Sequence, residues 1–124
     1  MIHITTRNGE NSIQLSNTEH FKTLINLLKR VKNIVKEEKN NNTLLDESLF
    51  EKEEEKNLYK FSNELEALEN QEFSVYIKTL LKKSDIIDEY FDNVIINTEN
   101  SKIKNNRIAL MKKIENSIEK IMII

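Results

Sequence analysis

Apolar residues recur at steps of three and four along most of this chain, which places them on one face of successive helices. Polar breaks separate five such segments. The expected core faces are Phe21, Leu24, Leu28, Val31 and Val35; Leu58, Phe61, Leu65 and Leu68; Phe73, Tyr76, Ile77 and Leu80; Ile87, Tyr90, Phe91 and Val94; and Met111, Ile114, Ile118 and Ile121. Helices joined by short connections predict an all-α fold, a compact bundle of about five helices.

Polar residues mark where these helices should begin. Ser16 starts a capping box for the first helix, and Asp46 is the expected N-cap of the second. Ser84 is the expected cap of the fourth helix, and the last should start at Ser101 or the asparagine before it. Residues 1–15 have no helical period, so we expect a weakly structured boundary segment there, or extended contacts, before a helical domain at 16–124.

Composition supports helices and excludes several kinds of site. The chain has no proline, no cysteine and one glycine, Gly9. Disulfides, thiolate zinc sites, cysteine nucleophiles and glycine-rich phosphate loops are therefore excluded. No apolar run reaches the ~18 residues of a membrane helix, and the polar start is unlike a signal peptide, so a soluble, cytoplasmic protein is expected.

The sequence contains no recognisable catalytic or metal site. His3 and His20 have no carboxylate at metal-ligand spacing, which favours surface or capping roles. The carboxylates within residues 51–56 are expected to form a solvated helix face with lysines one turn away. No cofactor is therefore expected for this chain.

Charge is unevenly distributed, although the formal net charge is only −2. Six basic and two acidic residues lie between Lys22 and Lys39, and the same numbers follow from Lys102 onward. Between Asp46 and Glu72 there are ten acids and three lysines. If the first and last helices are neighbours, the bundle has one basic and one acidic flank. Ordinary solvated faces are the alternative.

The run YFDNVIIN, residues 90–97, has two interpretations. Asp92 and Asn93 can end a helix, because Asn tolerates the left-handed conformation and Asp bonds nearby amides. Alternatively, they hold a functional loop against the last helix. Arg107 could then satisfy a buried carboxylate such as Asp92 or reach an RNA phosphate, and the structural role is favoured.

This run and three others resemble one family, the C-terminal anticodon-binding (DALR-type) domain of the bacterial glycyl-tRNA synthetase β chain. The matching segments are LLKRVKNIV, LFEKEEEKNLY, YFDNV and NNRIALM, in the family's order. The matching residues in the last two are Phe91, Asp92, Asn93, Val94, Asn106, Arg107, Ala109 and Leu110. The sequence departs from the family at residues 101–104, where Ser-Lys-Ile-Lys replaces Asp-Ala-Leu-Arg. The proline usual before the aromatic pair is also missing.

The resemblance implies a helical module that binds the anticodon arm of a glycine tRNA. Glycine activation with ATP would belong to the separate α chain, and the rest of the β chain and the α chain would be partners. The candidate RNA-binding residues are Lys29, Arg30, Lys32, Lys36, Tyr90, Lys102, Lys104 and Arg107. The lysines and arginines would contact phosphates, and Tyr90 would stack on a base. Phe91, Asp92 and Asn93 would be a structural motif.

A helical protein-interaction module without an RNA role is the alternative. It predicts that the first and last helices lie apart, so that the basic segments do not combine. The near-neutral net charge also suggests that the isolated domain binds RNA weakly.

Overall fold

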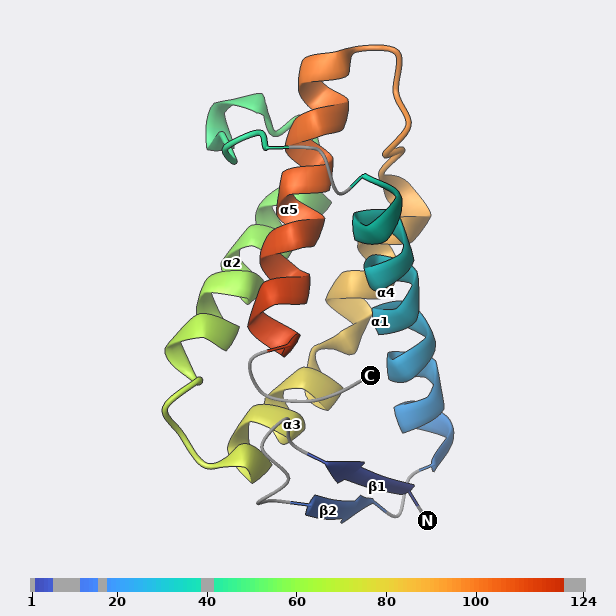
Figure 1. The fold of residues 1–124 in the computed structure, drawn as a ribbon, viewed down its shortest axis with the longest axis vertical. Coiled ribbons are helices and arrows are strands. Elements are labelled where there is room, and N and C mark those ends of the chain that lie inside the picture. The colour runs from blue at the N-terminus through green and yellow to red at the C-terminus, as the bar shows by residue number, and fades with distance from the viewer. Residues whose placement is uncertain (1, 6–11, 16–17, 39–41, 120–124) are drawn as a thin grey trace.

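The computed structural model describes residues 2–5, 12–15, 18–38 and 42–119, and within them five α-helices form a bundle (Figure 1). The helices are α1 (Thr18–Glu37), α2 (Glu53–Ala67), α3 (Phe73–Lys82), α4 (Ser84–Asn93) and α5 (Ser101–Glu119), with a short 3-10 helix, η1 (Glu47–Leu49), before α2. Figure 1 draws α5 in front, between α2 and α1, with α4 behind them. The predicted helical bundle is confirmed.

Two short strands precede the bundle. β1 (Ile2–Thr5) pairs antiparallel with β2 (Ser12–Leu15), so that Ile2 lies opposite Leu15 and Ile4 opposite Ile13. Figure 1 shows this hairpin at the end of the bundle where α1 begins. The extended contacts considered for this segment are therefore strand pairing, while a domain boundary at residue 15 stays a prediction.

The predicted apolar faces of all five helices meet in a single core. Leu28 on α1, Leu65 on α2, Ile87 on α4 and Leu110 on α5 are each at most 2% exposed. The first three lie on predicted faces, and Leu110 is next to Met111, which was predicted for α5. Val35, Leu68 and Phe73 pack at the margin of this core, and the side chains of Phe21 and Ile121 lie outside the described part of the chain. A fully buried side chain of this size contributes about 1.5–3 kcal/mol, so this cluster is the main source of stability.

The last helix begins at the predicted position, Ser101, and the residue before it caps it. The Asn100 side-chain oxygen accepts the backbone N–H groups of Lys102 at 3.0 Å and Ile103 at 3.2 Å, at the start of α5. These amides have no partner within the helix, so the asparagine supplies one. The capping box at Ser16 lies outside the described residues.

Two of the predicted caps, Asp46 and Ser84, are wrong. The Asp46 carboxylate accepts the Ser48 hydroxyl at 2.6 Å and the Ser48 amide at 2.9 Å, so it caps η1, whereas α2 begins at Glu53. Both hydrogen bonds hold the pKa of Asp46 below its ordinary value. Ser84 is the first residue of α4 instead of its N-cap, which is Lys83, and the Ser84 hydroxyl donates to the Leu81 carbonyl at 3.1 Å.

Candidate nucleic-acid interface

The helices α1 and α5 lie side by side and run in opposite directions (Figure 1). At one end of their contact, the Lys104 ammonium lies 3.6 Å from the Glu38 carboxylate. Further along, burial and the Glu119 carboxyl raise the pKa of Glu115 to about 7, and Lys32 and Lys112 oppose this rise. Cations of both helices therefore meet at one seam, as the charge pattern suggested.

Three lysines of α1 share the side that meets this seam. Lys29, Lys32 and Lys36 follow one another at steps of three and four, so they lie on one helix face, and all three are exposed. Lys112 joins them from α5, where it is partly exposed. We call these four lysines the basic face. Lys112 was not among the candidates, because its place beside Lys32 depends on how two distant helices pack.

Arg30 lies on the opposite side of α1, away from the basic face. Its guanidinium carbon is 4.2 Å from the centroid of the Phe91 ring on α4, while the side chain stays exposed. A guanidinium over an aromatic face is held by a cation–π interaction. The four basic candidates of α1 are thus divided, with three lysines toward α5 and the arginine toward α4.

Lys102 and Lys104 lie in the first turn of α5. Lys102 is exposed, whereas the Lys104 side chain is 31% exposed and paired with Glu38. Cations near a helix N-terminus are disfavoured by the helix dipole. The Glu38 carboxylate partly neutralises Lys104. Lys102 is exposed and remains a candidate for RNA contact.

Arg107 is buried, with only 4% of its surface exposed. One of its terminal nitrogens lies 3.1 Å from the carboxylates of both Glu51 and Glu55, and the other donates to the Ile95 carbonyl. The guanidinium thus joins α5 to the start of α2 and to the α4–α5 loop. These contacts are consistent with the structural role favoured for Arg107, with Glu51 and Glu55 as its partners. Asp92, the carboxylate suggested by the sequence, is exposed.

Glu55 is the buried carboxylate that the sequence interpretation missed. It is 0% exposed, and one of its oxygens accepts the backbone N–H groups of Glu51 and Lys52, both at 3.1 Å, as well as Arg107. The solvated face expected for residues 51–56 is therefore wrong at this position. A usable signal existed, since Glu55 precedes Leu58 by three residues and so lies on the core stripe of α2.

Asn106 makes a second connection from α5 to the segment before α2. The side chain is fully buried; its oxygen accepts the Asp46 amide at 2.7 Å and its nitrogen donates to the Asp46 carbonyl at 3.0 Å. The Asn106 side-chain amide thereby satisfies both the backbone N–H and the backbone C=O of Asp46. Asn106 and Arg107 together fasten residues 46–55 to α5.

Tyr90 is also a core residue. It is 0% exposed, and burial, followed by the nearby Glu55 carboxylate, raises the pKa of its hydroxyl. Its ring cannot stack on an RNA base in this conformation, so burial removes Tyr90 and Arg107 from the RNA-binding candidates. Phe91 is 9% exposed beside it, and α4 ends at Asn93, whose side chain donates to the Glu89 carbonyl at 3.0 Å.

The described residues offer neither a metal site nor a membrane-spanning helix. They contain no group of three or more His, Cys, Asp or Glu side chains placed to hold a metal ion. Within the same part of the chain, no helix combines the length and apolar character required to cross a membrane.

Comparison with known proteins identifies one family. Residues 24–124 match the family model described as the DALR anticodon binding domain. The glycine–tRNA ligase β subunit of Aquifex aeolicus is 36% identical over 103 residues, covering 83% of this chain and 15% of the relative. That of Persephonella marina is 33% identical over 117 residues, covering 87% and 16%, and that of Lactobacillus acidophilus 38% over 92 residues, covering 73% and 13%. The chain thus spans about one seventh of the length of these relatives and belongs to the DALR anticodon binding domain family.

Proposed function

We propose that this chain binds the anticodon arm of a glycine tRNA, with the basic face as the main contact to the RNA backbone. The observation that supports this is the convergence of Lys29, Lys32 and Lys36 with Lys112, in a chain of an anticodon-binding family. Clustered lysines bind phosphates and release counterions, which gives affinity without base specificity. Lys102 extends this surface at the start of α5.

The proposal makes this chain a non-catalytic part of a glycine–tRNA ligase. Glycine activation with ATP would take place on a separate α chain, while this chain needs no cofactor of its own. Its partners would be the tRNA, the α chain and further parts of the β chain, and its location the cytoplasm, where tRNA is charged. The names of the relatives support this assignment.

The charge balance predicts weak, salt-dependent binding by the chain alone. The net charge is −2, so attraction must come from the local face instead of the whole molecule. Four lysine–phosphate contacts with an unpaired strand correspond to a slope of about −3 in a plot of log affinity against log salt concentration.

A salt-titrated binding assay tests the proposal. Fluorescence anisotropy with a labelled glycine tRNA anticodon stem-loop would compare the wild type with the triple variant Lys29→Glu, Lys32→Glu, Lys36→Glu. We expect the variant to lose at least about tenfold in affinity and to show a shallower salt slope. The matched control reverses three exposed lysines of α2 and α3, Lys60, Lys78 and Lys82, and should bind like the wild type. The proposed surface would be refuted if both variants lost affinity equally, or if neither variant lost affinity.

The alternative of a protein-interaction module receives no support from the helix arrangement. It predicted that the first and last helices are apart, whereas α1 and α5 pack along one another.

A further inference from the structure

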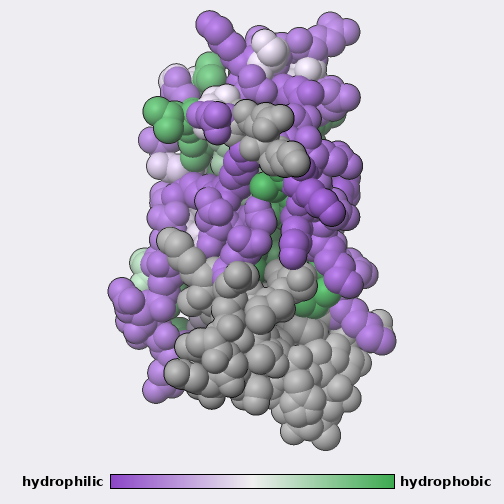
Figure 2. Space-filling model, viewed as in Figure 1, coloured by the Kyte–Doolittle hydropathy of each residue, from purple (hydrophilic) through white to green (hydrophobic). Residues whose placement is uncertain are grey.

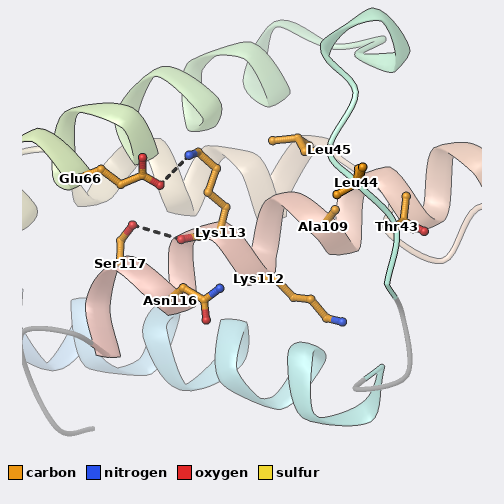
Figure 3. Close-up of a pocket in the computed structure, with 9 residues that line it drawn as sticks. All are labelled: Thr43, Leu44, Leu45, Glu66, Ala109, Lys112, Lys113, Asn116 and Ser117. Carbon is orange, nitrogen blue, oxygen red and sulfur yellow. Dashed lines mark hydrogen bonds and ion pairs between the residues drawn. The ribbon is translucent and has the colours of Figure 1, made fainter.

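Several polar side chains on the outer surface of α5 have partners within the protein. Figure 3 shows a pocket of about 290 Å³ there, in which the Lys113 ammonium is 2.6 Å from the Glu66 carboxylate and the Ser117 hydroxyl donates to the Lys113 carbonyl at 3.1 Å. Figure 2 shows that the described side chains on the face containing α5 are mostly hydrophilic. A polar atom at such a surface can also bond to solvent, whereas a buried one depends on the protein and on ordered water.

The interior of the joint between α2, α4 and α5 is different. Glu55 and Tyr90 are 0% exposed, and Arg107 is 4% exposed. Within the residues that the structure describes, one atom of each has no hydrogen-bond partner: Oε2 of Glu55, the hydroxyl of Tyr90 and Nε of Arg107. Buried polar atoms are nearly always hydrogen-bonded, because an unsatisfied one has lost its bonds to water without replacement. Three such atoms at one joint therefore point to a ligand.

The three atoms belong to side chains that lie together. Nη2 of Arg107 is 3.1 Å from Oε1 of Glu55, which places Nε of the same guanidinium and Oε2 of the same carboxylate close to this contact. Burial, followed by the Glu55 carboxylate, raises the pKa of Tyr90, and the Arg107 guanidinium opposes the rise. The Tyr90 hydroxyl therefore lies close to both charged groups and keeps its proton.

The groups at this joint favour a small neutral ligand. The guanidinium of Arg107 disfavours a bound cation, and the carboxylate of Glu55 disfavours a bound anion. Arg107 Nε can only donate a hydrogen bond, an ionised Glu55 can only accept one, and the Tyr90 hydroxyl can do either. A ligand that bonds to all three must both donate and accept. Water does so, and buried waters typically make about three hydrogen bonds to otherwise unsatisfied polar groups.

We infer that Glu55, Tyr90 and Arg107 bind one buried water molecule where α2, α4 and α5 meet. The water accepts a hydrogen bond from Arg107 Nε, donates one to Glu55 Oε2 and makes a third with the Tyr90 hydroxyl. Because Arg107 also donates to the Ile95 carbonyl, the water connects α4 to the network that holds the α4–α5 loop. The inference is independent of the proposed function, since RNA takes no part in it.

A high-resolution crystal structure of the full chain tests the water directly. We expect an electron-density peak about 2.7–3.2 Å from Glu55 Oε2, from Arg107 Nε and from the Tyr90 oxygen. The inference is overturned if there is no such peak, for instance because Arg107 Nε and Glu55 Oε2 bond to each other directly.

Nuclear magnetic resonance provides a second readout in solution. A bound water gives the Arg107 Hε proton a nuclear Overhauser effect with the solvent signal. The Tyr90 hydroxyl exchanges its proton with solvent and can relay the same signal, so the measurement is repeated on Tyr90→Phe. We expect the effect to persist in this variant, since the water keeps two of its three partners. Loss of the effect in Tyr90→Phe would overturn the inference.

Tyr76→Phe is the matched control for this measurement. Tyr76 is also 0% exposed, but its hydroxyl donates directly to the Ser117 carbonyl at 3.0 Å. Its removal should leave the solvent signal at Arg107 Hε unchanged. An equal loss of the signal in both variants would show that it reports general loosening of the core, which would contradict a water held by Glu55 and Arg107.

Discussion

Arg107 and the basic face are both cationic regions close to α5, and their surroundings give them different roles. Arg107 is 4% exposed and bound to Glu51, Glu55 and a backbone carbonyl. The side chains of Lys29, Lys32 and Lys36 are exposed and that of Lys112 partly so, which lets the RNA of the proposal reach them. The comparison teaches that residue type alone does not identify the RNA contact. Nearby carboxylates and burial decide whether a cation stabilises the fold or binds a ligand.

The largest expected effect is on the buried cation. Arg107→Met would leave Glu55 buried without its partner, which should lower the free energy of unfolding by about 3–5 kcal/mol. Urea denaturation followed by circular dichroism measures this loss. Lys102→Met is the control in the exposed first turn of α5 and should stay within about 0.5 kcal/mol of the wild type. A loss below about 1 kcal/mol for Arg107→Met would mean that the ion pair is not a structural support.

The neighbouring amide should have the next largest effect. Asn106→Ala removes both hydrogen bonds to the Asp46 backbone, so we expect a loss of about 1–3 kcal/mol in the free energy of unfolding. Asn63→Ala on the exposed side of α2 controls for the better helix propensity of alanine. If both variants have the same stability in thermal unfolding, the Asp46 connection contributes nothing.

The seam between α1 and α5 should respond to pH. Because the pKa of Glu115 is about 7 in the folded chain and 4.5 in the reference state, the folded state binds more protons between these values. Stability is therefore fully present below about pH 4.5 and falls as pH rises through 7. Partial exposure limits this contribution to the order of 1 kcal/mol.

Glu115→Gln should remove that part of the pH dependence. Unfolding measured at pH 5 and pH 8 should show a smaller fall for this variant than for the wild type or for Glu89→Gln, an exposed carboxylate on α4. An unchanged fall would show that Glu115 does not titrate in this range.

The smallest effect should be at the contact between α1 and α4. Arg30→Met loses the cation–π interaction with Phe91, at a cost of about 0.5–1 kcal/mol. Because Arg30 lies off the basic face, the same variant should lower RNA affinity less than Lys32→Met does. The reverse order in an anisotropy titration would place the RNA on the α4 side of α1.

Helical periodicity predicted the bundle because burial follows one face of each helix, as Leu28 and Leu65 show. Residue types that favour helix caps were a weaker guide than the apolar period. Asp46 has the residue type of a cap, yet its carboxylate binds Ser48 in η1, a 3-10 turn that no apolar period indicated. Tyr90 was expected both on a core face, from its helical spacing, and among the RNA contacts, from the family resemblance, and its burial is consistent with the core role alone.

The candidate site depended on tertiary structure that the sequence does not specify locally. Lys29, Lys32 and Lys36 could be grouped from their spacing, but Lys112 joins them only because α5 packs against α1. A pocket between residues 43–45 and α5 could not be predicted from the sequence for the same reason. It forms where residues 43–45 pass over Ala109, which is more than sixty positions away in the chain.

Side-chain nitrogen NMR during titration with the anticodon stem-loop tests the central claim most directly, since it observes lysines and arginines in one experiment and tolerates weak binding. The account predicts that the ammonium signals of Lys29, Lys32, Lys36 and Lys112 shift with added RNA, while the guanidinium signals of Arg107 stay in place. Shifts at Arg107 with unchanged lysines would contradict it.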